Sequence, residues 1–168
     1  MPDATVGGEF RYELPLDVRF RDTDAMGHVN NAVYLTYFEA ARAGYYRAVT
    51  GRSFTGIDEE PVSIILARAS VDFRAQAYFG EQLLVGCRTS WVGRSSFALA
   101  YRIVAAPDST RGAGRLIAEG ETILVTFDYA KQRPVQIPAE LAARLAAFEG
   151  APIPPRPGRP SGARPPSA

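Results

Sequence analysis

Hydrophobic and polar residues alternate along most of the second half of the chain, after a stretch with helical spacing. The alternation predicts strands with one buried face, because successive side chains of a strand point to opposite sides of a sheet. These strands are expected at residues 62–77, 82–92, 96–104 and 116–129. A shorter alternation over residues 10–20 predicts a first strand, in which Pro15 favours an edge position or a bulge.

The helical spacing covers residues 31–50, and its apolar side chains lie on nearly every side. Between positions 32 and 43 the charged residues are Glu39 and Arg42. A helix that is apolar all round is a buried helix, so we expect the strands to wrap it. Asn30 or Asn31 is suited to cap its start.

Short breaks separate the four later strands, at residues 78–81, 93–95 and 107–114, and such breaks are typical of hairpins. A short terminal helix is expected over residues 138–148. The predicted class is α+β, with a long buried helix wrapped by a mainly antiparallel sheet of five or six strands. One helix leaves the edges of such a sheet exposed, which favours pairing with a second copy.

The 168 residues are enough for one domain with a core, which we place at residues 9–150. Residues 1–8 are expected to be a flexible N-terminus. Residues 151–168 are rich in Pro and Arg and contain one large apolar residue, Ile153. This segment buries too little apolar surface to offset its ordering entropy, so it is predicted to be a disordered tail.

Charge and composition exclude several classes of partner. A net charge of +1 gives no electrostatic reason to expect a nucleic acid or a membrane surface. No apolar run approaches the roughly 20 residues of a membrane span, and the N-terminus lacks the pattern of a signal peptide. A cytoplasmic location is the resulting expectation. Cys87 is the one cysteine, so no intramolecular disulfide is possible.

Residues 22–31, Asp-Thr-Asp-Ala-Met-Gly-His-Val-Asn-Asn, carry the densest candidate chemistry, directly before the predicted helix. They contain two carboxylates, the chain's single histidine and two asparagines. A helix start presents unpaired backbone N–H groups and a partial positive charge. A carboxylate beside such donors suits attack on a carbonyl whose oxygen gains negative charge. The alternative is a well-capped helix start.

The motif from Arg21 to Asn31, continued by Tyr34-Leu35-x-Tyr37-Phe38-Glu39-x-x-Arg42, resembles the hotdog-fold acyl-CoA thioesterases of the 4-hydroxybenzoyl-CoA thioesterase type. The resemblance covers about residues 16–129. Its weaker parts are Val71-Asp72-Phe73, Phe79-Gly80-Glu81 and Gly93-Arg94-Ser95-Ser96-Phe97.

This resemblance implies hydrolysis of an acyl-CoA or acyl-carrier-protein thioester to a free acid and a thiol, without a cofactor. It assigns the catalytic carboxylate to Asp24 and the donor to the thioester oxygen to the backbone N–H near Asn31. It also implies a coenzyme A groove with phosphates near Arg94 and Ser96, beside Ser95. In many relatives the partner subunit helps to complete the site, so a homodimer or a homotetramer is expected.

The residues themselves leave the mechanism open. Asp24 can attack the carbonyl as a nucleophile or draw a proton from water as a general base. His28 is a candidate for catalysis or for substrate orientation, but it can equally fix the turn, since relatives with a catalytic His here carry Asn where this chain has Met26. Asp22 is interpreted as a capping residue. No metal site is expected, because no cluster completes Asp22, Asp24 and His28.

Two further residues and one turn each have two possible interpretations. Gly27 permits an unusual backbone angle or a close approach of substrate. Glu39 is expected to pair with Arg42 or another chain, with catalysis as the alternative. The turn at residues 94–96 binds phosphate or is merely polar.

Two other functions compete with thioester hydrolysis. A non-catalytic acyl-CoA sensor would use the same fold, but this chain shows no output segment. A hydratase or dehydratase on that fold would carry a differently spaced Asp/His motif. We therefore favour the hydrolase.

Overall fold

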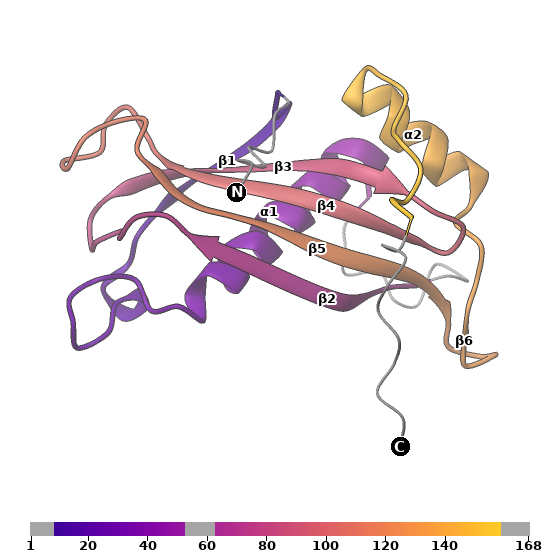
Figure 1. Cartoon of the computed structure of the whole chain (residues 1–168), viewed down its shortest axis with the longest axis horizontal. Coiled ribbons are helices and arrows are strands. Elements are labelled where there is room, and N and C mark those ends of the chain that lie inside the picture. Colours follow the sequence, from indigo (N-terminus) through magenta and orange to yellow (C-terminus); the bar gives the residue numbers. More distant parts are fainter. Residues whose placement is uncertain (1–8, 53–62, 159–168) are drawn as a thin grey trace.

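The computed structural model describes residues 9–52 and 63–158. A six-stranded sheet packs one face against a long helix (Figure 1), which confirms the predicted α+β class. The strands are β1 (Tyr12–Asp17), β2 (Ser63–Phe73), β3 (Gln82–Val92), β4 (Ser96–Ala105), β5 (Leu116–Asp128) and β6 (Arg133–Pro134). The helices are α1 (Val33–Thr50), α2 (Ala139–Glu149) and the short 3₁₀ helix η1 (Phe20–Asp22).

The strand order is β1-β3-β4-β5-β2, with β6 paired to the end of β5 and every ladder antiparallel. The hairpins predicted at residues 93–95 and 107–114 are present. The hairpin predicted at residues 78–81 is wrong, because β1 occupies the free side of β3. Strand β2 pairs with β5 instead, at the far edge of the sheet, and residues 74–81 cross the end of the sheet between the two edges.

Helix α1 lies across the sheet with one face buried, on which Tyr37, Phe38 and Tyr45 are at most 1% exposed. Its opposite face is open in the single chain, where Leu35 is 44% exposed and Glu39 is also exposed. The prediction of a helix buried on nearly all sides is therefore wrong for one chain. The helix packs against one face of the sheet, so the sheet buries only the side of the helix that it contacts.

A close helix–sheet contact sits at the middle of α1. The ring of Phe38 stacks on Tyr101 of β4, with centroids 4.2 Å apart and planes 13° apart. Gly120 of β5 makes room for this contact, because a Cβ at that position would overlap the Phe38 ring. The helix can therefore approach the sheet closely at this point.

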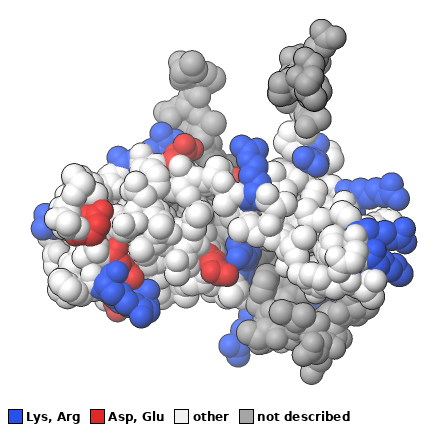
Figure 2. Space-filling view, turned by 90° about the horizontal axis from the view of Figure 1, so that it is seen from below, with Lys and Arg blue, Asp and Glu red and all other residues white. Residues whose placement is uncertain are grey.

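Strand β2 forms one edge of the sheet and pairs with β5 alone among the described strands. Leu66 and Phe73 of this strand are about half exposed. Figure 2 looks onto the molecule from the β2 side, where uncharged atoms form most of the described surface and charged groups stand apart in small clusters. This edge therefore presents both backbone hydrogen-bonding groups and apolar side chains.

Residues 151–158 differ from the predicted disordered tail. The Val92 N–H donates to the Pro154 carbonyl at 3.0 Å, and the Arg156 guanidinium lies 5.3 Å from the centre of the Trp91 ring. Ile153 packs against the core. The second half of β3 extends beyond β1, and residues 151–158 cover the strand edge that β1 leaves unpaired there. Residues 1–8 and 159–168, predicted to be flexible and disordered, lie outside the described residues.

A buried carboxylate ties together the end of the sheet near β1 and β3. Glu81 is fully buried and accepts hydrogen bonds from Arg115 Nη2, at 2.9 Å to each oxygen, from Ser109 Oγ and from Tyr78 N. Burial alone raises the pKa of Glu81, but these bonds outweigh it and lower the pKa below its usual value. The ionised pair therefore anchors the crossing segment.

We predict that Glu81→Ala lowers the free energy of unfolding by about 3 kcal/mol, because it leaves Arg115 and two further donors without their acceptor. Urea unfolding followed by circular dichroism measures the loss. The control is Glu140→Gln at the exposed Glu140–Arg144 pair, which should change stability by less than about 0.5 kcal/mol. Equal effects of the two variants would contradict the prediction.

Candidate active site

The chain makes a tight turn just before α1. Thr23 and Val29 pair as an antiparallel bridge, the Asp24 N–H donates to the His28 carbonyl at 3.0 Å, and the Gly27 N–H donates to the Asp24 carbonyl at 3.0 Å. Gly27 has a φ of 83°, in the left-handed region that favours glycine. The unusual backbone angle considered for Gly27 is therefore present, and it closes the turn that brings Asp24 and His28 together.

Asp24 and His28 share one side of this turn. Oδ1 of Asp24 accepts a hydrogen bond from the Met26 N–H at 2.8 Å, and Oδ2 lies 3.9 Å from Nδ1 of His28. The two side chains are 26% and 19% exposed, respectively. One carboxylate oxygen is thus held by the backbone, while the other faces an imidazole at a partly sheltered surface. This arrangement is suited to proton transfer or to attack on a nearby carbon.

Asn30 and Asn31 lie between the turn and the helix. Asn30 accepts from the Ala32 N–H through Oδ1 and from the Val33 N–H through its carbonyl, each at 2.9 Å. Because Asn30 organises this preceding turn, α1 begins at Val33 rather than at residue 31, and its N-cap Ala32 makes no side-chain cap. In the described part of the chain, the exposed Asn31 has no acceptor for its backbone N–H.

Asp22 is buried, with an exposed fraction of 2%, and its carboxylate is fully engaged. It accepts three hydrogen bonds from Arg19, through N, Nε and Nη2, each at 3.0 Å, and one from the Tyr37 hydroxyl at 3.0 Å. Burial raises the pKa of Asp22, but these bonds more than offset it, so the pKa lies below its ordinary value. Asp22 thus has a structural role, and it joins the turn to α1.

The Tyr37–Asp22 bond was not predicted from the sequence. Tyr37 falls on the apolar face of the predicted helix, where a tyrosine fits as a core residue. The one signal was chemical, since a buried tyrosine hydroxyl needs a hydrogen-bond partner.

The turn of Arg94, Ser95 and Ser96 lies away from Asp24 in the single chain. It joins β3 to β4, whereas Asp24 lies near the start of β3, where Asp17 pairs with Gln82. The 11 residues of β3 span about 35 Å at roughly 3.3 Å per residue. Arg94 is exposed and Ser96 is buried. One protomer therefore does not bring these two predicted parts of a site together.

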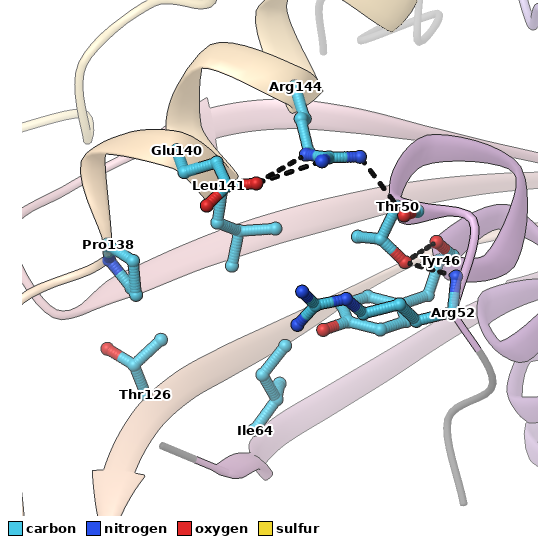
Figure 3. Close-up of a pocket in the computed structure, with 9 residues that line it drawn as sticks. All are labelled: Tyr46, Thr50, Arg52, Ile64, Thr126, Pro138, Glu140, Leu141 and Arg144. Atoms are coloured by element: carbon cyan, nitrogen blue, oxygen red, sulfur yellow. Dashed lines mark hydrogen bonds and ion pairs between the residues drawn. The ribbon is translucent and has the colours of Figure 1, made fainter. Parts of the chain in front are cut away.

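A pocket of about 80 Å³ lies at the same end of the sheet as the Arg94–Ser96 turn (Figure 3). Side chains of α1, β2, β5 and α2 line it together with Arg52 and Pro138, and Tyr46 and Arg52 are directed inward. Thr126 joins it to the turn, because the Thr126 N–H donates to the Ser95 carbonyl at 3.0 Å. The pocket was not predicted, since its walls come from four elements separated in sequence.

Glu39 lies on the open face of α1, with its side chain 71% exposed. Its Oε1 lies 3.6 Å from Nη2 of Arg42, so the expected pairing of these two residues is present. Glu39 points away from the helix face that meets the turn.

Two features are absent from the described residues. Residues 9–52 and 63–158 contain no group of three or more His, Cys, Asp and Glu side chains arranged to hold a metal ion. Within the same ranges, no helix combines the length and the apolar character needed to cross a bilayer.

Comparison with known proteins agrees with the fold and the motif. Residues 18–145 match the Thioesterase-like superfamily, so the chain belongs to that family. Among solved structures it is similar to a thioesterase from Thermus thermophilus complexed with coenzyme A and Zn. The two are 34% identical, with a TM-score of 0.72, and the match covers 86% of this chain and 98% of that one.

Two curated relatives differ in their named substrates. The acyl-CoA thioesterase YbgC of Haemophilus influenzae is 27% identical over 133 residues, which cover 79% of this chain and 92% of the relative. The acyl-acyl carrier protein thioesterase ATL3 of Arabidopsis thaliana is 25% identical, and the match covers 82% of this chain and 68% of the relative. These relatives support the thioesterase-like family as a whole and do not single out the 4-hydroxybenzoyl-CoA type.

The lowered pKa of Asp22 predicts a pH-dependent contribution to stability. The ionised carboxylate stabilises the fold above its unfolded pKa of about 4, and this stabilisation is lost as the pH falls through the lower folded pKa. Urea unfolding from pH 7 to pH 2.5 should show the difference between wild type and Asp22→Asn shrinking below about pH 4. The exposed Asp17→Asn variant is the control. A difference that stays constant over this range would contradict the assignment.

Proposed function

We propose that this protein hydrolyses acyl thioesters of coenzyme A or of an acyl carrier protein. The observation that carries the proposal is a partly sheltered Asp24 carboxylate on the turn, followed by the unpaired Asn31 N–H between that turn and α1, in a chain of the thioesterase-like family. The relatives named above support both classes of thiol carrier.

In the proposed reaction, the thioester carbonyl oxygen accepts a hydrogen bond from the Asn31 N–H. Asp24 either takes a proton from a water that attacks the carbonyl carbon, or attacks that carbon itself and forms an anhydride that water then opens. In both routes the C–S bond breaks, the thiolate leaves and takes up a proton to become the free thiol, and water supplies the oxygen of the free acid. His28 lies close enough to Asp24 to orient the carboxylate or to contact the substrate.

We predict that Asp24→Asn lowers kcat by about 10³-fold or more while the protein stays folded. Thiol release from a series of acyl-CoAs and from one acyl carrier protein thioester measures the loss, and circular dichroism checks the fold. The exposed Asp108→Asn variant is the control. Near wild-type turnover by Asp24→Asn would overturn the assignment, and binding of acyl-CoA without thiol release by the wild type would favour a sensor.

We propose that the protein acts as a dimer paired along β2. This strand has 11 residues, contains no proline and leaves one side unpaired among the described strands. Long unprotected edges are templates for pairing with another strand. Half-exposed Leu66 and Phe73, together with the open face of α1, supply apolar surface beside that edge.

An antiparallel β2–β2 pair supports coenzyme A binding between two copies. In that arrangement the Phe73 end of one strand meets the Ser63 end of the other. Ile65 and Ser96 both pair with Val125, so Ser96 lies two strand spacings, about 10 Å, from the β2 edge. The partner's Arg94–Ser96 turn and adjoining pocket would then face the Asp24 end of the first copy, with Arg94 as a phosphate-binding side chain.

Mixed dimers test this arrangement. We predict that Arg94→Ala alone raises KM for acyl-CoA by about tenfold, since it removes one charge-assisted hydrogen bond. A purified heterodimer of one Asp24→Asn chain and one Arg94→Ala chain should recover about half of wild-type activity at low substrate concentration, because one of its two sites keeps both groups.

If Arg94 instead served the Asp24 of its own chain, neither site of the heterodimer would be intact. A heterodimer no more active than the two parent variants would therefore overturn the two-chain site. A monomeric wild type in sedimentation analysis would overturn the dimer itself.

A further inference from the structure

We infer that Asp22 and Tyr37 are positioning residues, which set the Asp24 carboxylate and the Asn31 N–H relative to each other. This inference rests on the proposed function. It arises from a buried hydrogen bond, 3.0 Å long, between the Tyr37 hydroxyl of α1 and Oδ2 of Asp22.

Asp22 is bonded to both sides of the turn. Its carboxylate is held by Arg19 on the incoming side and by Tyr37 on the helix. Its carbonyl accepts a hydrogen bond from the Asn30 N–H at 2.9 Å on the outgoing side. Asp24 lies two residues after Asp22, and Asn31 directly follows Asn30. The positions of the two proposed catalytic groups therefore both depend on where Asp22 is held.

Tyr37 fixes that position relative to the helix. It is 1% exposed, and its ring packs beside Tyr34 with centroids 6.1 Å apart. The Asn31 N–H must point at the thioester oxygen while Asp24 reaches the carbon or the attacking water. A shift of about 1 Å in such a pair costs on the order of 10²-fold in rate. The Tyr37 hydroxyl would thus affect turnover without touching the substrate.

The chain provides a matched control in Tyr45. This residue is also on the buried face of α1 and also 1% exposed. Its hydroxyl donates to Oε1 of Glu149 and lies 2.8 Å from Oγ1 of Thr89, at the other end of the helix from Asp22. Phe at either position keeps the ring and removes one buried hydroxyl. The two variants therefore differ in which end of α1 loses its hydrogen bond.

The test measures kcat, KM and Tm for Tyr37→Phe, Asp22→Asn and Tyr45→Phe at a temperature well below each Tm. We expect Tyr37→Phe and Asp22→Asn to lower kcat by about 10–100-fold with KM within about twofold of wild type. Tyr45→Phe should lower Tm by a similar number of degrees and leave kcat within about twofold. If the role of Tyr37 were purely structural, Tyr37→Phe would lower Tm and leave kcat unchanged.

Normal kcat in Tyr37→Phe, or an equal fall of kcat in Tyr45→Phe, would overturn the positioning role. The Asp24→Asn variant separates this failure from that of the proposed function. If Asp24→Asn is inactive and Tyr37→Phe is fully active, only the positioning inference fails. If Asp24→Asn keeps wild-type turnover, the assignment of Asp24 fails, and the positioning role falls with it. If the wild type releases no thiol, the proposed function itself fails.

Discussion

The burial of one face of α1 against the sheet is the contact on which the rest of the structure depends. Phe38 and Tyr101 stack at its centre, where Gly120 lets the helix come close. The residues at the two ends of that face are aromatic and also hydrogen-bonded, through Tyr37 to Asp22 and through Tyr45 to Glu149. A single apolar interface therefore holds both the turn before the helix and the terminal helix after the sheet.

The positions of the strands could be predicted from sequence because hydrophobic and polar residues alternate along them. The expected strand at residues 82–92 coincides with β3, and the others agree to within a few residues. Strand neighbours could not be predicted in the same way, since alternation reveals the buried face but not the partner. Strand β2 therefore pairs with β5 at the far edge of the sheet, where a hairpin between β2 and β3 was expected. Apolar composition likewise did not reveal that one face of α1 is open.

The core of the candidate site was visible in the motif, whereas its supports were not. Asp24 and His28 are four residues apart, and Gly27 between them made a tight turn predictable. The Tyr37–Asp22 bond depends on which helix face meets the turn, and this requires the packed structure. The separation of Arg94 from Asp24 depends on the direction and length of β3, so sequence resemblance alone did not reveal it.

The two edges of the sheet differ in a way that limits growth by strand addition. Strand β1 is short and carries Pro15, which lacks a backbone N–H, and residues 154–155 cover the end of β3 beyond it. Within residues 9–52 and 63–158, strand β2 has no such protection. Pairing of β2 with β2 of a second copy would cover that edge in both chains. Association would then close at two chains, and the protein would avoid the open-ended filaments that two equally exposed edges permit.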